Sequence, residues 1–206
     1  MDRDEWRPFL KRWSEEWIAG HDPERDAPLE AEVVRDGWLG FAPARPEEIA
    51  AAEARLGQML PPSLRTFLLA TNGWRNAGSF IYRLAGTAEL GWLRDMDEHW
   101  IDAYGGYEAG DVTDHLERCL QISLAGDACV LFLDPGDVDG DGEWAAYRLA
   151  SWSGEGPSRH ASFGDLMGDL HAGFHALCKP PGRTRDEWDV HDHAGARPGD
   201  PRDAAG

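Results

Sequence analysis

Two groups of residues in this 206-residue sequence have the types and spacing of metal ligands. His171, His175 and Cys178 stand at i, i+4 and i+7, so one helix would present all three to a zinc ion. Residues 137–142 read DVDGDG, which matches the first half of a calcium-binding EF-hand loop. Position 12 of that loop requires a bidentate glutamate, but this chain has Arg148 there, so an acidic hairpin turn is the better interpretation. The histidines lack an H-E-x-x-H motif, and we expect no metal ion and no other cofactor.

Motifs for catalysis are missing from the sequence. There is neither a G-x-S-x-G nucleophile elbow nor a phosphate-binding P-loop. Residues 140–145 have the spacing G-x-G-x-x-A, but the surrounding aspartates would repel a pyrophosphate. We therefore predict that the protein is not an enzyme. A small metal-dependent hydrolase that uses His171, His175 and nearby acids is the alternative.

The charge of the chain is strongly negative. Lys and Arg number 20 and Asp and Glu number 38, which gives a net charge of −18 at pH 7. Such a field repels nucleic acids and anionic membranes, so we expect neither as a partner and favour a basic protein. Solubility alone would also explain an acidic composition.

Location and redox state follow from two further features. The longest apolar run, residues 128–133, is far shorter than the roughly 18 residues of a membrane span, and no signal peptide is visible. Cys119, Cys129 and Cys178 are odd in number and form no C-x-x-C pair, which favours reduced thiols. We expect a cytoplasmic protein.

Helical patterns occupy both ends of the sequence. Aromatic and aliphatic residues recur every three or four positions over residues 6–18, and a proline followed by two glutamates opens a second helix at residue 46. Pro61 and Pro62 end that helix and begin another, which ends at Asn72-Gly73. Ser162 caps a last helix to about Leu177. A long packed connection is expected over residues 21–46, and a flexible tail over residues 179–206.

Between these helices the pattern changes to short apolar runs separated by glycine and acidic residues, which is typical of β-strands. The predicted strands are residues 79–84, 90–93, 120–123, 129–133 and 145–152. The acidic segment at residues 95–117 is predicted to be a loop with some helix at residues 99–104.

The first helical pair resembles the signature of the SMI1/KNR4 (SUKH) family. Ile49, Glu53 and Leu56-Gly57 match its I-x-x-x-E-x-x-L-G helix. Residues 60–68 match L-P-x-x-[YL]-[RK]-x-F-L, and Asn72-Gly73 follows at the family spacing. The resemblance extends over residues 38–177. We expect the apolar signature positions to be core: Ile49, Leu56, Leu60, Leu64, Phe67, Leu68 and Trp74.

This resemblance implies an α+β fold with N-terminal helices, a mostly antiparallel twisted sheet, and a C-terminal helix packed on that sheet. A single domain would span residues 1–178. It also implies a non-enzymatic binding role: bacterial members are typically immunity proteins that neutralise a toxin, often a nuclease, and fungal members are regulatory adaptors. We expect an immunity-type protein whose partner is a basic toxin domain. An adaptor that binds a host protein is the alternative, and the oligomeric state stays open.

The partner surface is expected in the acidic segment between the second and third predicted strands, since charges steer encounter and aromatic side chains anchor interfaces. The alternative is a solvated loop whose aromatic side chains pack on the sheet. The acidic turn at residues 137–143 is the second candidate. The expected partner-binding residues are Asp95, Asp97, Glu98, Trp100, Asp102, Tyr104, Tyr107 and Asp111.

Overall fold

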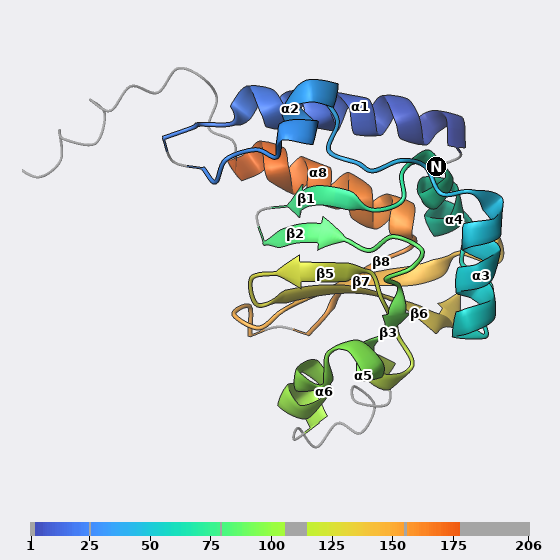
Figure 1. The fold of residues 1–206 in the computed structure, drawn as a ribbon. Helices are drawn as coiled ribbons and strands as arrows, with labels where there is room; N and C mark the ends of the chain where they lie inside the picture. Colours follow the sequence, from blue (N-terminus) through green and yellow to red (C-terminus); the bar gives the residue numbers. More distant parts are fainter. Residues whose placement is uncertain (1–2, 25, 79, 106–114, 155, 178–206) are drawn as a thin grey trace, which may run out of the picture.

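The computed structural model describes residues 3–24, 26–78, 80–105, 115–154 and 156–177. Helices lie at the top and right of the molecule, strands cross its middle, and two short helices lie below the strands (Figure 1). Buried side chains from α1 (Arg3–Gly20) to α8 (Phe163–Leu177) contribute to one main hydrophobic core. The predicted tail at residues 179–206 lies outside the described residues.

Helix α1 confirms the amphipathic pattern of residues 6–18. Trp6, Leu10 and Trp13 lie on its inner face and are fully buried. The indole Nε1 of Trp6 donates a hydrogen bond to Thr66 Oγ1 at 3.1 Å, which ties α1 to the helix beneath it. Lys11 and its polar neighbours remain on the outside, as the helical period requires.

The signature pair folds as predicted into α3 (Pro46–Leu56) and α4 (Pro62–Ala70). A proline begins each helix, and Gly57 ends α3 in the left-handed conformation, φ 70°, that glycine adopts without a Cβ penalty. All seven expected core positions of this signature are buried. The expected connection before it contains a short helix, α2 (Ala31–Asp36), that the pattern did not predict.

Two antiparallel sheets follow the helical pair. The first has the order β1-β2-β5 and the second β3-β4-β6-β7-β8. Every predicted run contains a strand, but residues 120–123 divide between the two sheets, and β1 and β8 were not predicted. The strands are β1 (Trp74–Gly78), β2 (Ile81–Leu84), β3 (Gly91–Trp92), β4 (Leu120–Gln121), β5 (Ser123–Gly126), β6 (Cys129–Val138), β7 (Trp144–Ala150) and β8 (Ser158–His160).

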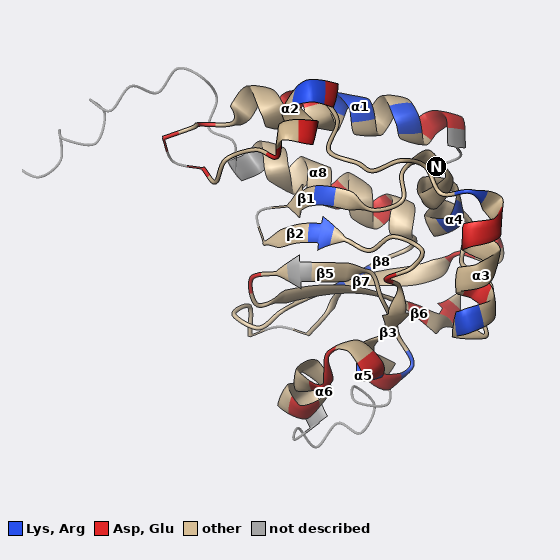
Figure 2. Ribbon diagram, viewed as in Figure 1, with Lys and Arg blue, Asp and Glu red and all other residues tan. Residues whose placement is uncertain are grey.

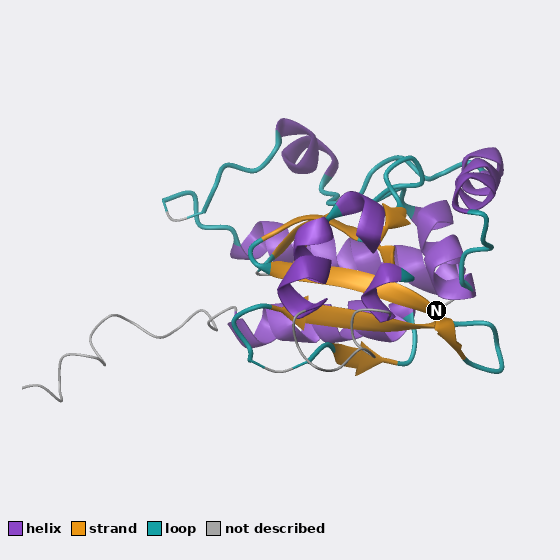
Figure 3. Ribbon diagram, turned by 90° about the horizontal axis from the view of Figure 1, so that it is seen from below, coloured by secondary structure: helices purple, strands orange, loops and turns teal. Residues whose placement is uncertain are grey.

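The larger sheet is covered on both faces. Along β6, Cys129, Leu131 and Leu133 belong to the main core, whereas Val130 and Phe132 face a second core. Successive side chains of a strand point to opposite faces, so this continuous apolar run requires cover on each side. Helices α5 (Leu93–Met96) and α6 (Glu98–Gly105) supply the second cover; the view from below shows helices in front of the strands (Figure 3).

Helix α8 closes the fold on the main-core side. Ser162 Oγ accepts the Asp165 N–H at 3.1 Å and donates to the Asp165 carboxylate at 2.9 Å, which confirms the predicted cap. The helix contacts β1 and β7, so the expected packing of a C-terminal helix on the sheet is confirmed. Its buried side chains are Phe163, Leu166, Met167, Leu170, His171 and Phe174.

Two of the three cysteines lie in the described residues, and both are buried free thiols. Burial raises the pKa of Cys129 to about 11 and that of Cys119 further. These thiols are therefore protonated and unreactive at neutral pH. Cys178 lies outside the described residues.

Candidate functional site

Helices α5 and α6 form an acidic projection of the described structure. Asp95, Glu98 and Asp102 are exposed, and Asp97 is half-buried where one helix passes into the next. We call these four residues the acidic surface. Figure 2 shows acidic segments on both helices, at the side of the molecule opposite α1 and α2.

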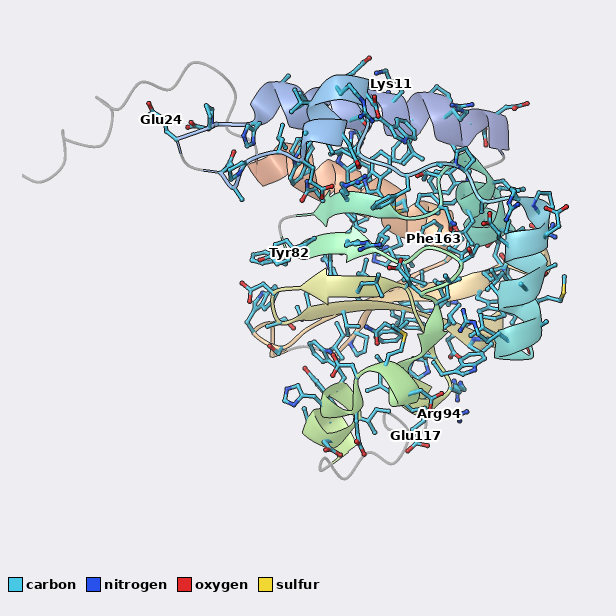
Figure 4. The ribbon with its side chains drawn as sticks, in the orientation of Figure 1. Lys11, Glu24, Tyr82, Arg94, Glu117 and Phe163 are labelled. Carbon is cyan, nitrogen blue, oxygen red and sulfur yellow. The ribbon has the colours of Figure 1, made fainter. Side chains whose placement is uncertain are left out.

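Few positive charges oppose the acidic surface. Arg94 Nε lies 3.7 Å from Asp95 Oδ1, and Arg94 is the only lysine or arginine in residues 91–117 of the sequence. Arg94 and Glu117 both lie beside these helices (Figure 4). Within the described part of the chain, Asp97, Glu98 and Asp102 form no ion pair. Their carboxylates therefore remain available to a basic partner.

The aromatic side chains of this segment do not share that exposure. Trp100 is only 8% exposed and packs in the second core beneath the helices with Leu93 and Phe132. Tyr104 is half-buried and stacks on Trp100, with ring centroids 6.3 Å apart. This burial agrees with the alternative that the aromatic side chains pack on the sheet, because the second face of the sheet requires an apolar cover and Trp100 supplies it.

Two expected partner-binding residues, Tyr107 and Asp111, lie outside the described residues.

The packing of Trp100 has a consequence for the acidic residues beside it. A short helix makes few hydrogen bonds of its own, so tertiary packing must hold it in place. Trp100 and Leu93 attach the two helices to the sheet and thus fix the position of the acidic surface.

The second candidate, the acidic turn at residues 137–143, uses its carboxylates internally. Asp137 accepts hydrogen bonds from Arg159 at 2.7 and 2.9 Å, and this pairing lowers its pKa. Asp139 Oδ1 accepts the N–H groups of Asp141 and Glu143, both at 2.9 Å. The hairpin interpretation of this segment is therefore confirmed, because the turn joins β6 to β7.

The structure brings the two helical histidines together with a residue that the sequence pattern left on the charged face of α1. His171 Nε2 lies 2.7 Å from Glu16 Oε2, and His175 Nε2 lies 3.1 Å from the same oxygen. In the sequence, Glu16 lies between Trp13 and Trp17 of the aromatic stripe. This position is the one sequence signal that Glu16 faces α8.

A third cluster surrounds a buried carboxylate on β6. The Arg118 guanidinium binds Asp134 through two hydrogen bonds, both 2.7 Å long, and His115 Nδ1 lies 2.9 Å from Asp134 Oδ2. Burial by itself raises the pKa of Asp134. The hydrogen bonds from Arg118 and from the Gly136 N–H outweigh burial, so the pKa lies below its usual value. This cluster holds the start of β4 against β6.

We expect Asp134→Asn to cost about 1–3 kcal/mol of unfolding free energy at pH 7, because it removes charge-assisted hydrogen bonds. A carboxylate with a lowered folded-state pKa stabilises the protein above the unfolded pKa of about 4, and this stabilisation disappears as pH falls through the lower folded value. Urea unfolding at pH 7 and pH 3 should show the difference from wild type shrinking in acid. Asp95→Asn on the exposed surface is the control, and a cost independent of pH would contradict the assignment.

Two concave regions lie away from the acidic surface. A groove of about 780 Å³ runs between α1, α2 and residues 38–43, and both basic residues (Arg7, Lys11, Arg75) and acidic residues (Glu32, Asp36) line it. A smaller hollow of about 270 Å³ lies beside Phe80 and Trp152, whose rings are 4.6 Å apart and about half exposed. Sequence reasoning missed this aromatic pair, since Phe80 was assigned to a strand and Trp152 to the end of another.

Comparison with known proteins tests whether the chain belongs to a known family. None of the helices in the described residues is both long and apolar enough to cross a membrane. No curated protein matches the sequence significantly. The family model described as the SMI1 / KNR4 family (SUKH-1) matches residues 43–169, from just before α3 into α8. This match covers more than half of the chain and agrees with the antiparallel α+β fold, so the chain belongs to the SMI1 / KNR4 family (SUKH-1).

Proposed function

We propose that this protein is an immunity-type protein that binds a basic toxin domain and neutralises it. The acidic surface on α5 and α6 is the observation that carries the proposal. Asp95, Glu98 and Asp102 are exposed on one projection, and Arg94 is the only lysine or arginine in residues 91–117 of the sequence. Family membership supports a protein-binding role, and the charge points to the kind of protein that is bound.

Electrostatics supply the mechanism of neutralisation. A toxin that acts on nucleic acid must present a positively charged cleft to the phosphate backbone. An acidic surface raises the rate of encounter with that cleft and competes with the nucleic acid for it. Because the buried Trp100 attaches α6 to the sheet, these carboxylates are positioned before the partner arrives. Less conformational entropy is therefore lost on binding.

The contact centre needs apolar side chains as well as charge. Met96 on α5 is 37% exposed and lies among the acidic residues. Ile101 and Tyr104 on α6 are only partly buried and lie within two residues of Asp102 in the sequence. We propose that these side chains contact the toxin while the surrounding acids orient it. Tyr107 and Asp111 extend the same proposed surface in the sequence.

A cytoplasmic regulatory adaptor that binds a host protein is the competing function. Gene neighbourhood distinguishes the two, because an immunity gene should lie beside a toxin gene. If it does, the neighbouring toxin domain should arrest growth when it is produced alone, and co-production of this chain should restore growth. The purified proteins should also form a stoichiometric complex. Failure of this chain to protect against the toxin or to bind it would contradict the proposal.

A further inference from the structure

Three side chains from two helices that are far apart in the sequence converge on one point. Glu16 comes from α1, and His171 and His175 come from successive turns of α8. The Nε2 atoms of the two histidines are 3.2 Å apart, and they lie 2.7 and 3.1 Å from Glu16 Oε2. All three potential ligand atoms therefore occupy the corners of one small triangle.

Hydrogen bonding alone does not account for this triangle. Each Nε2 carries at most one proton, and the carboxylate oxygen carries none when ionised. If both Nε2–H groups point to Glu16, two N–H groups face each other across the third side. If either Nε2 lacks its proton, its lone pair faces a carboxylate lone pair. At most two of the three contacts can be good hydrogen bonds, whereas a cation bound by all three atoms would receive one lone pair from each of them.

We propose that Glu16, His171 and His175 bind one divalent transition-metal ion of the zinc class. Imidazole nitrogen and carboxylate oxygen are zinc ligands at about 2.0–2.2 Å, so neighbouring ligand atoms in a tetrahedral site stand about 3.3 Å apart. Two sides of the triangle, 3.1 and 3.2 Å, agree with that spacing, and the third, 2.7 Å, needs only a small movement of the Glu16 side chain. Water would complete the coordination.

The surroundings hold these side chains in position. The His171 ring is buried against Phe9 and Trp13, at centroid distances of 5.2 and 5.1 Å, which fixes its orientation. Arg12 lies 3.9 Å from Glu16 Oε1, the other carboxylate oxygen, and thus leaves Oε2 to the histidines.

Accessibility also fits a metal site. The side chains of His175 and Glu16 are 49% and 31% exposed, so an ion can enter from solvent. The other cluster of potential metal ligands consists of His115, Cys119 and Asp134. It is less suitable, because the Arg118 guanidinium already binds both carboxylate oxygens of Asp134. A cation there would have to displace a bidentate partner of like charge.

The position of the site suggests its role. Glu16, His171 and His175 all lie outside the segment 43–169 that matches the family model. The ion would clamp α1, which precedes that segment, to the final turns of α8, which follow it. This site is therefore independent of the acidic surface and of the proposed toxin partner, and each proposal can fail without the other.

The test uses the full chain, stripped of metal with a chelator and titrated with zinc chloride. Calorimetry and elemental analysis should show one zinc ion bound per chain. At free zinc about a hundredfold above the dissociation constant, the melting temperature should rise by roughly 5–10 °C. Cobalt(II) in place of zinc should give the visible absorption of a tetrahedral site. No uptake of zinc by the stripped wild type would overturn the proposal.

Variants locate the bound ion. Glu16→Gln and His175→Ala should each weaken zinc binding at least tenfold and remove the rise in melting temperature, while the metal-free proteins stay folded. Glu15→Gln and His99→Ala are matched controls, because both side chains are exposed and lie outside the triangle; they should bind zinc as wild type does. If zinc binding survives in both test variants but is lost in His191→Ala/His193→Ala, the ion belongs to the tail and the proposal is wrong.

Discussion

Replacing Asp95, Glu98 and Asp102 together by lysine should slow association with the toxin domain by about 10- to 100-fold at low ionic strength. All three side chains are exposed, so the change turns an attractive field into a repulsive one without disturbing the core. Exposed charges contribute little to folding, and the melting temperature should therefore stay within a few degrees of wild type. Stopped-flow mixing with the neighbouring toxin domain measures the rate.

The salt dependence provides a second readout of the same change. Association of the wild type should slow markedly as salt is added, because screening weakens long-range attraction beyond about 10 Å at 0.1 M. The triple variant should show a flat or inverted dependence. Dissociation should change less than association if the acids mainly steer the encounter.

A matched triple variant separates local charge from net charge. Glu24, Glu47 and Asp127 are exposed, and their carboxylates form no ion pair within the described residues. Glu24 lies at the opposite end of the molecule from α5 and α6 (Figure 4). Lysine at these three positions changes net charge equally but should reduce the rate only slightly. Equal slowing by both triple variants would show that no local surface steers the partner.

Trp13→Ala should cause the largest loss of stability, about 3–5 kcal/mol of unfolding free energy. Trp13 is fully buried and contacts Trp74 and His171, at ring-centroid distances of 5.9 and 5.1 Å. Its removal would leave a large cavity where α1, β1 and α8 meet. Since domains are typically stable by only 5–15 kcal/mol, much of the total would be lost. Urea unfolding followed by circular dichroism measures this cost.

Two substitutions on the same helix test the cause. Trp13→Phe keeps most of the buried apolar volume, and the indole Nε1 that it removes has no hydrogen-bond partner in the described structure, so its cost should be clearly smaller. Trp17→Ala affects a half-buried ring that stacks on Phe174 and should also cost less. A cost below about 1 kcal/mol for Trp13→Ala would mean that α1 is a peripheral addition to the fold.

Helix α1 precedes the segment that matches the family model, yet it belongs to the main core. Its amphipathic period was readable from the sequence because one buried face is enough to produce a 3-and-4 pattern of aromatic residues. The sequence did not indicate what the face packs against. In the structure, Trp6 contacts Phe67 of α4 and Phe163 of α8, so this helix joins the two ends of the family segment.

The sequence by itself determined helices α1, α3, α4 and α8, their end signals and the core of the signature pair. Pro46 and Pro62 begin helices, Gly57 ends one, and Ser162 caps the last; each choice depends on neighbours within four residues. Most strands were found for the same reason, since alternation and turn residues act locally. Strand β1 was missed because its Arg75 and Asn76 interrupt the apolar pattern, although Arg75 is buried and hydrogen-bonds to the Gly40 carbonyl.

Only the tertiary structure decided how the candidate sites are composed. The sequence left open whether Trp100 faces a partner or packs on the sheet; the second face of β6 has apolar residues that need cover, and burial of Trp100 supplies it. Glu16 was read as a residue of a solvated helix face, but α1 crosses α8 so that Glu16 meets His171 across 155 positions in the sequence. Such encounters depend on how complete elements pack against one another, and no local pattern encodes that arrangement.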